Sequence, residues 1–315
     1  MKQLSGIARS VQVFFRQLSG VPKTEASPVK RKTLGVALGG GFARGMVHIG
    51  VLKVLEEAQI PIAAVSGTSS GAIMAAGYCS GLSATQMAEI GRRLRFKDFA
   101  RWTLEPGGFC SNDRLGAFIT RTLPCKDFTE MRTPLVVVAT ELLSGKPAIF
   151  REGPICEAVR ASCAYPGMFT PVSHNGLLYV DGMLSYEVPT TPLKEMGIDC
   201  VLGVHLQSKW NPAKAPGHFF DVIGQCFAIA QTRMSLQWEK DADLLLHPNV
   251  DDFAFDDFDR GAELIAIGEA SMRAALPQLK RVLGIAEAME VPVKVKDLPA
   301  AVTQTVRPSE AGTVA

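Results

Sequence analysis

Residues 34–71 read LGVALGGGFARGMVHIGVLKVLEEAQIPIAAVSGTSSG, and they contain two short apolar runs separated by a helical pattern. The runs at 34–38 and 62–66 have the length and the apolar character of buried strands. Residues 44–57 between them are expected to form a helix that ends at an acidic pair. Strands that alternate with helices predict an α/β fold, with a largely parallel sheet covered on both faces.

The same alternation continues through the rest of the chain. Further strands are expected at 134–140, 147–150, 177–181, 200–206 and 243–248. Helices are expected at 84–95, 113–123, 154–162, 221–238 and 260–281. The tail beyond about residue 302 is polar, with small residues, Pro and Gly, a composition typical of disorder.

The segment 67–71, GTSSG, has the pattern GxSxG and lies between an expected strand and an expected helix. In a nucleophile elbow, the serine occupies a tight strand-to-helix turn that small flanking residues permit. Its hydroxyl then stands at a helix N-terminus, where the helix dipole favours developing negative charge. This context predicts Ser69 as a nucleophile, whereas the alternative is a Ser/Gly-rich loop that only caps the helix.

The glycine-rich loop 39–45, GGGFARG, follows the first strand and opens the next helix. Consecutive glycines let backbone N–H groups converge on an anion. The spacing of a dinucleotide-binding GxGxxG fails in both registers, and the GKS/T of a phosphate-binding P-loop is missing. We therefore expect an oxyanion hole with Gly40 and Gly41 as donors and the Phe42 N–H as a further candidate. Arg44 is expected to lock this loop or to attract an anionic headgroup.

A serine nucleophile also needs a proton acceptor. Asp181 ends the run 177–181 and precedes Gly182, so we expect a carboxylate at the C-terminal edge of the parallel sheet, where ligand sites gather. Enclosure there raises a carboxyl pKa and makes it a better base. Two alternatives remain: an Asx-turn role for Asp181, which is common before Gly, and a triad that uses His205 or His247.

Several motifs together resemble the patatin-like phospholipases, in particular the bacterial single-domain members. The stretches that carry the resemblance are GGGFARG (39–45), GTSSG (67–71), PLVVVATELLSG (134–145), RASCAYPGMFTPV (160–172) and YVDG (179–182). The match is good over residues 34–200 and looser over 201–281.

The resemblance implies a three-layer α/β/α fold and a Ser–Asp dyad that hydrolyses lipid esters. On the matching positions, Ser69 is the nucleophile, Asp181 the base, and Gly40 and Gly41 the oxyanion donors. Phe42 interrupts the longer glycine run of the family, and it is expected to narrow the acyl entrance or alter the donor geometry. Met183 also stands where the family carries a small residue after Asp-Gly. Neither departure removes a catalytic atom.

We therefore expect a serine esterase that acts on phospholipids, lysophospholipids or other lipids through an acyl-enzyme, without metal or cofactor. An acyltransferase would use the same dyad, and a non-catalytic lipid-binding regulator is the alternative of a different class. Residues 91–102, GRRLRFKDFARW, combine five basic residues with three aromatics. They are expected to form either a lipid-touching flap near the site or a solvated amphipathic helix.

Charge is unevenly placed along the 315 residues. Residues 1–33 carry seven Lys or Arg and one acid, so their balance is +6, and the total of +2 leaves −4 for the remainder. Such an arm points to an anionic surface, membrane or nucleic acid, and we favour membrane. Residues 4–18 have helical apolar spacing with Phe14 and Phe15. They fit an interfacial helix, a helix packed on the protein's own body, or a mitochondrial presequence.

The seven cysteines form no CxxC pair and are scattered in apolar stretches, which favours a reducing cytosol over disulfides or a zinc site. No apolar run approaches the ~20 residues of a membrane-spanning helix. A cytoplasmic location is expected, with peripheral contact at the inner membrane face as a second option. Four segments follow: an arm and linker (1–33), a catalytic core (34–200), the C-terminal part of the same domain (201–282), and a partly disordered extension (283–315).

Overall fold

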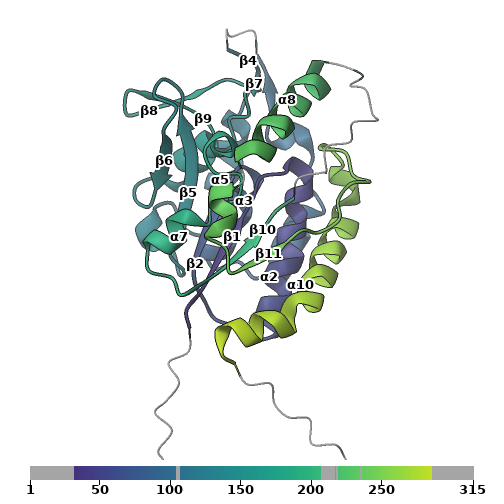
Figure 1. Cartoon of the computed structure of the whole chain (residues 1–315). Coiled ribbons are helices and arrows are strands. Elements are labelled where there is room, and N and C mark those ends of the chain that lie inside the picture. Colours follow the sequence, from purple (N-terminus) through teal and green to yellow (C-terminus); the bar gives the residue numbers. More distant parts are fainter. Residues whose placement is uncertain (1–31, 104–106, 207–216, 218, 235, 286–315) are drawn as a thin grey trace, which may run out of the picture. The chain divides into compact units, whose positions relative to one another are not determined.

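The computed structural model describes residues 32–103, 107–206, 217, 219–234 and 236–285. Their main sheet has eight strands in the order β11-β10-β1-β2-β5-β9-β8, with β6 pairing with β5. The strands are β1 (Leu34–Leu38), β2 (Ile62–Thr68), β5 (Leu135–Glu141), β6 (Pro147–Phe150), β8 (Val172–His174), β9 (Leu177–Asp181), β10 (Cys200–Val204) and β11 (Leu244–Leu246). Figure 1 shows these elements and the helices around them.

The sheet is parallel through β11, β10, β1, β2 and β5. It becomes antiparallel where β6 and β9 join β5 and where β8 joins β9. Parallel neighbours need crossover connections, and helices supply these on the two faces. The expectation of a mostly parallel sheet is confirmed, with an antiparallel edge added to it.

Alternate residues of β1 face opposite sides of the sheet. Leu34, Val36 and Leu38 belong to the larger apolar core, whereas Ala37 belongs to a second core with Leu193 and Trp238. Helices cover both cores, so the fold has three layers, α/β/α, as expected. The larger core includes residues of α2 (Val47–Glu57), α3 (Ser70–Cys79), α4 (Ala84–Gly91), α5 (Asp113–Thr122), α6 (Ile155–Ser162) and α10 (Gly261–Leu283). The second includes residues of α7 (Thr191–Glu195) and α9 (Leu236–Lys240).

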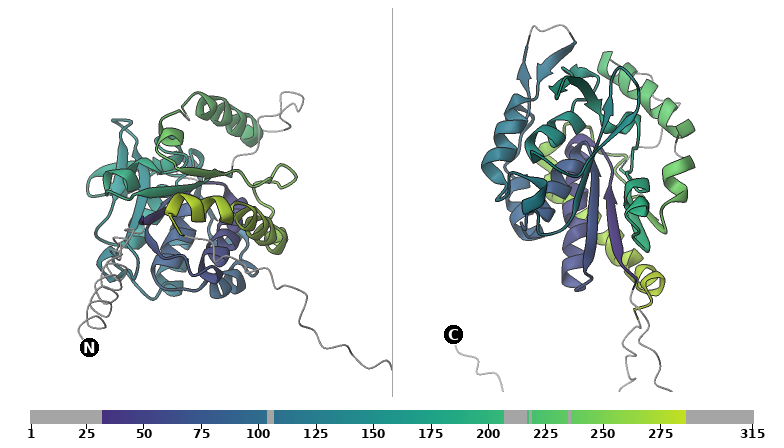
Figure 2. Two further views of the ribbon diagram at one scale, coloured as in Figure 1. Left: turned by 60° about the horizontal axis from the view of Figure 1, so that its bottom comes forward. Right: turned by 90° about the vertical axis from the view of Figure 1, so that its left-hand side faces the viewer.

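Several connecting elements were not expected from the sequence. A second sheet joins β3 (Arg101–Trp102), β4 (Gly108–Ser111) and β7 (Gly167–Phe169). The helix expected at 84–95 ends at Gly91, and the one expected at 221–238 is described as α8 (Phe219–Met234) and α9. The remaining elements are short 3-10 turns: η1 (Phe42–Met46), η2 (Phe96–Asp98), η3 (Phe128–Glu130), η4 (Gly182–Leu184) and η5 (Phe258–Arg260). Figure 2 shows two further views.

The strand that carries Asp181 requires a correction. We expected it to run parallel to its neighbours, but β9 is antiparallel to β5 and pairs Asp181 with Ala139. Thr68 pairs with Val138, one residue before Ala139 on the same strand. Ser69 and Asp181 therefore reach the same level of the sheet from opposite directions. Asp181 is still at the C-terminal edge of β2, but it arrives there as the last residue of a strand that runs in the opposite direction.

No helix among the described residues is long and apolar enough to cross a membrane. The expected amphipathic helix at 4–18, the linker up to residue 31 and the part of the expected 283–315 extension after residue 285 lie outside the residues that the structure describes. Residue 283, where that extension was expected to begin, is the last residue of α10. Both β10 and β11 extend the sheet that β1 and β2 form, so residues after 200 contribute to the same sheet.

Candidate active site

Ser69 lies at the turn between β2 and α3. Its backbone has φ 55 and ψ −125, a region that non-glycine residues rarely adopt. A Cβ at position 71 would lie 2.1 Å from the Leu38 carbonyl oxygen, so only glycine lets this turn approach β1 so closely. A strained serine at a strand-to-helix turn is typical of a nucleophile elbow.

The last turn of α6 and the residues after it hold the elbow and Asp181 together. The Ser69 N–H donates to Ser162 Oγ at 2.8 Å, and this hydroxyl donates to the Val138 carbonyl at 2.6 Å. The Asp181 N–H donates to the Ala164 carbonyl at 3.0 Å. Ser162 is fully buried, so solvent does not compete for these bonds. Two residues that are 112 positions apart are thus bound to one short segment.

Asp181 is fully buried, and its carboxyl group is only partly satisfied. Oδ1 accepts the Met183 N–H at 3.0 Å, whereas Oδ2 has no hydrogen-bond partner among the described residues. Burial raises the pKa of Asp181 to about 7, and the Met183 N–H and the Ser69 hydroxyl oppose that rise. The Ser69 N–H and the Asp181 N–H are both bonded to the segment 162–164, which places the serine and the carboxyl group on the same side of the sheet edge. A carboxyl with a pKa near neutrality beside a serine has the properties of a general base.

The glycine loop approaches the same serine. A Cβ at position 40 would lie 3.2 Å from Ser69 Cβ, so the bare backbone of Gly40 faces the nucleophile. The N–H groups of Gly40 and Gly41 bond to no described residue. The Gly40 N–H is therefore placed to bind the oxyanion of a tetrahedral intermediate, whereas a Cβ at position 41 would meet Leu206 and Arg44.

Two side chains hold this loop in place. His48 is fully buried, and its Nε2 donates to the Gly39 carbonyl at 2.8 Å. Burial lowers the pKa of His48 to about 4, which keeps the imidazole neutral at pH 7. Arg44 donates from Nε and Nη2 to the Phe253 carbonyl at 3.1 and 2.9 Å. Of the two roles expected for Arg44, this geometry supports locking of the loop.

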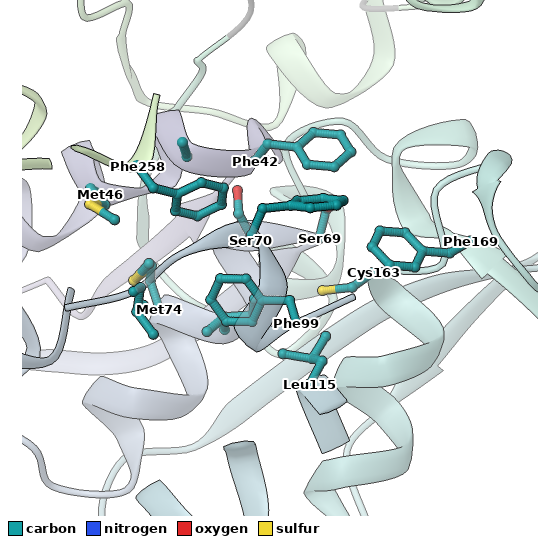
Figure 3. Close-up of a pocket in the computed structure, with 14 residues that line it drawn as sticks. Phe42, Met46, Ser69, Ser70, Met74, Phe99, Leu115, Cys163, Phe169 and Phe258 are labelled. Atoms are coloured by element: carbon teal, nitrogen blue, oxygen red, sulfur yellow. The ribbon is translucent and has the colours of Figure 1, made fainter. Parts of the chain in front are cut away.

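An apolar pocket opens beside Ser69 (Figure 3). Phe42 adopts φ 52 and lines this pocket, where its ring makes edge contacts with Tyr165 and Phe255. Apart from Ser69 and Ser70, the pocket is lined by Phe42, Ala43, Met46, Ile73, Met74, Leu94, Phe96, Phe99, Leu115, Cys163, Phe169 and Phe258. Such a lining suits a hydrocarbon chain better than a polar acid.

The segment 91–102 does not form the amphipathic helix that was one expectation. After α4 ends, Leu94, Phe96 and Phe99 turn inward and line the pocket. Only Trp102 among the aromatics of this segment is largely exposed, at 72%. The segment thus forms one wall of the pocket and also carries an aromatic side chain at the surface.

The histidines considered for a triad have other partners. His205 Nε2 lies 2.8 Å from Glu187 Oε1, and its Nδ1 lies 3.2 Å from His247 Nδ1. Both ring nitrogens of His205 are therefore occupied, and none is left for Ser69. This geometry favours the carboxylate over a histidine as the partner of the serine.

Sequence reasoning missed Ser162, His48 and the segment around Phe253. Ser162 lies in the stretch 160–172, but nothing local indicates that its hydroxyl connects the Ser69 turn to β5. His48 was overlooked because we considered only histidines that follow the GxSxG motif. A histidine directly after a glycine loop, on the buried face of the next helix, is a usable signal for such a role.

Ser162→Ala should lower both activity and stability. The change leaves the buried Ser69 N–H and Val138 carbonyl without their partner, which costs roughly 1–3 kcal/mol in the free energy of unfolding. Because the elbow loses its anchor, kcat for a soluble ester should fall more than KM rises. Urea unfolding and steady-state kinetics measure the two effects, with the exposed Ser173→Ala as control. A wild-type kcat in Ser162→Ala would contradict the positioning role.

Comparison with known proteins adds relatives of two kinds. An uncharacterized NTE family protein of Mycobacterium bovis is 29% identical over 197 residues, covering 58% of this chain and 51% of its own length. Lysophospholipase nte1 of Aspergillus fumigatus is 22% identical over 281 residues, covering 79% of this chain and 18% of its own. The chain thus spans about half or less of the length of these relatives.

Among solved structures, VipD from Legionella pneumophila matches with a TM-score of 0.46 at 15% identity, covering 81% of this chain and 69% of its own. The family model described as patatin-like phospholipase matches residues 36–194, half of the chain. This range begins in β1 and contains the glycine loop, the serine elbow and the strand that ends at Asp181. The chain belongs to the patatin-like phospholipase family.

Proposed function

We propose that this chain is a lipid acyl hydrolase that cleaves carboxylic ester bonds of phospholipids, lysophospholipids or other lipids through a Ser69–Asp181 dyad. One observation carries the proposal: a strained serine lies beside a buried carboxyl group and at an apolar pocket. Family membership and the fungal lysophospholipase relative support the same class of reaction.

The proposed reaction has two steps. In the first, Asp181 takes the Ser69 proton while Oγ attacks the ester carbonyl, and the N–H groups of Gly40 and Gly41 hold the oxyanion. The C–O bond to the alcohol then breaks, and the proton on Asp181 passes to the leaving alcohol. In the second step, Asp181 takes a proton from water while the water oxygen attacks the acyl carbon. The bond between that carbon and Ser69 Oγ then breaks, the carboxylic acid leaves, and the proton on Asp181 passes to Oγ.

The pocket supports a substrate with an apolar acyl chain. Ser69 is at its wall, and the side chains of Phe99, Met74 and Leu115 line it further. An acyl group bonded to Oγ would place its hydrocarbon tail against these residues. The burial of that tail would supply binding energy of about 0.8 kcal/mol per methylene.

Competitive labelling with a fluorophosphonate, followed by a panel of lipid esters, tests the proposal. Lipid esters that are substrates should slow labelling of the full-length protein and release free fatty acid. Failure of the folded protein to label would remove the hydrolase and favour the non-catalytic lipid-binding alternative. Labelling with acyl transfer to an added alcohol in place of fatty acid release would assign an acyltransferase instead.

A further inference from the structure

The exposed apolar side chains gather at one end of the molecule. Ten large apolar residues in the described part of the chain are exposed, and nine lie on segments beyond the C-terminal ends of β1, β2 and β5. We call these nine the apical surface: Trp102, Phe109, Leu142, Leu143, Leu177, Leu178, Phe219, Val222 and Ile229. Figure 1 shows β4, β7, β8 and α8 at this end. The tenth, Met196, follows α7 and precedes β10 at the other end of the sheet.

The β3–β4 ribbon carries exposed aromatic side chains on both of its faces. Trp102 pairs with Cys110, so these two side chains share one face of the ribbon. Phe109 precedes Cys110 and points to the other face. Trp102 is 72% exposed and Phe109 48%. Phe109 contacts Phe219 of α8, which partly covers its face of the ribbon, whereas Trp102 on the other face is available to the interfacial region of a bilayer.

Helix α8 is apolar on its outer side as well as on its inner side. On the inner side, Ile223 lies against Gly167, and Phe227 makes an edge contact with Tyr165. On the outer side, a stripe of exposed residues recurs at spacings of three, four and three: Phe219, Val222, Cys226 and Ile229. An exposed apolar stripe on a helix that already packs its inner side is normally covered. Because Phe219 contacts Phe109, this stripe continues the aromatic surface of the ribbon.

The apical surface leads to the proposed active site. Phe227 of α8 contacts Tyr165, with ring centroids 5.4 Å apart, and Tyr165 contacts Phe42 at 5.2 Å. Phe42 lines the pocket beside Ser69. Two aromatic contacts therefore connect the inner side of α8 to the wall of the pocket.

Positive charge accompanies these apolar residues. Residues 91–102 carry five basic side chains and one acid, Asp98, a balance of +4. Arg95 and Arg101 form ion pairs with Asp259 and Asp113. The other three, Arg92, Arg93 and Lys97, are exposed and form no ion pair with a described residue. Uncompensated cations on the segment that carries the exposed Trp102 are complementary to anionic lipid headgroups.

We propose that the apical surface docks into the headgroup region of an anionic bilayer and admits lipid to the pocket from that surface. The inference deepens the proposed function, but the docking itself does not depend on catalysis. Trp102 and the outer stripe of α8 supply the apolar contact, and the cations of residues 92–97 supply the attraction.

Vesicle sedimentation of the full chain tests this proposal. All proteins carry Ser69→Ala, so that hydrolysis does not alter the vesicles. With vesicles of phosphatidylglycerol and phosphatidylcholine, Trp102→Ser combined with Val222→Ser should lower partitioning at least tenfold. Met196→Ser is the matched control, because it removes an exposed apolar side chain from the opposite end, and it should bind as before. Arg92→Gln with Arg93→Gln should weaken binding severalfold to these anionic vesicles but not to vesicles of phosphatidylcholine alone.

Three results would overturn the proposal. The first is unchanged partitioning of Trp102→Ser/Val222→Ser. The second is loss of binding only on deletion of residues 1–32, which would assign the contact to the N-terminal arm. The third is dissociation of a lipid-free oligomer by the apical variant while vesicle binding persists, because the surface would then join copies of this chain.

Ester hydrolysis is measured separately from vesicle binding, so that the proposed function and the docking surface are tested independently. With Ser69 intact, the apical variant should hydrolyse a soluble short-chain ester at the wild-type rate, which also reports its folding. If the wild-type protein cleaves no ester and yet binds vesicles through Trp102 and Val222, the hydrolase proposal fails and the docking surface stands.

Discussion

Ser69→Ala is expected to abolish ester hydrolysis while leaving the fold intact. The change removes only Oγ, and the alanine methyl occupies the place of the serine Cβ. The backbone bond from residue 69 to Ser162 does not involve the hydroxyl of residue 69, so the elbow keeps its anchor. Loss of a nucleophile lowers kcat on the order of 10⁴–10⁶-fold in serine hydrolases. Turnover of p-nitrophenyl esters, with circular dichroism to check folding, measures the effect.

Ser70→Ala is the neighbouring control. The hydroxyl of Ser70 is buried and bonds to no described residue, so its removal leaves no partner unpaired. This variant should still form the covalent adduct with a fluorophosphonate, whereas Ser69→Ala should not. Substantial ester turnover by a correctly folded Ser69→Ala protein would remove the nucleophile assignment.

Asp181→Asn is expected to cost about a thousandfold or more in kcat, the scale for disabling a catalytic base. Asparagine has nearly the same shape, and its carbonyl is able to accept the Met183 N–H, but its amide cannot take the Ser69 proton. The dependence of wild-type kcat/KM on pH should report the titration of the Asp181 carboxyl. Because burial raises the pKa of Asp181 to about 7, the carboxyl is protonated and inactive below that pH. The value of kcat/KM should therefore rise as pH increases through about 7. In Asp181→Asn the residual kcat/KM should not show this rise.

His205→Gln and His247→Gln distinguish the dyad from a triad. His205 is bonded to Glu187 and faces His247, so neither change should approach the loss in Asp181→Asn. A histidine variant as inactive as Asp181→Asn would favour the triad.

The local features of the candidate site could be predicted from the sequence alone. Gly40, Gly41, Ser69 and Asp181 were all chosen from short motifs, and the structure brings Gly40 and Asp181 to Ser69. Tight turns restrict the residues on both sides, because few side chains tolerate such backbone angles and close approaches. The alternation of strands and helices could also be predicted from the sequence, since it depends on the spacing of apolar residues within each segment.

The tertiary structure alone decided how distant segments meet. One example is the direction of β9, which is antiparallel to β5. Two others are hydrogen bonds between residues far apart in the chain, from the Ser69 N–H to Ser162 and from Arg44 to the Phe253 carbonyl. A serine hydroxyl or an arginine accepts many partners equally well, so its own neighbours in sequence do not specify which one it finds. The same holds for residues 91–102, whose apolar side chains turn inward or outward according to the elements packed against them. The motifs could be recognised in the sequence because backbone geometry restricts which residues fit a tight turn. The partners of a side chain could not, because they depend on which strands and loops the whole fold places side by side.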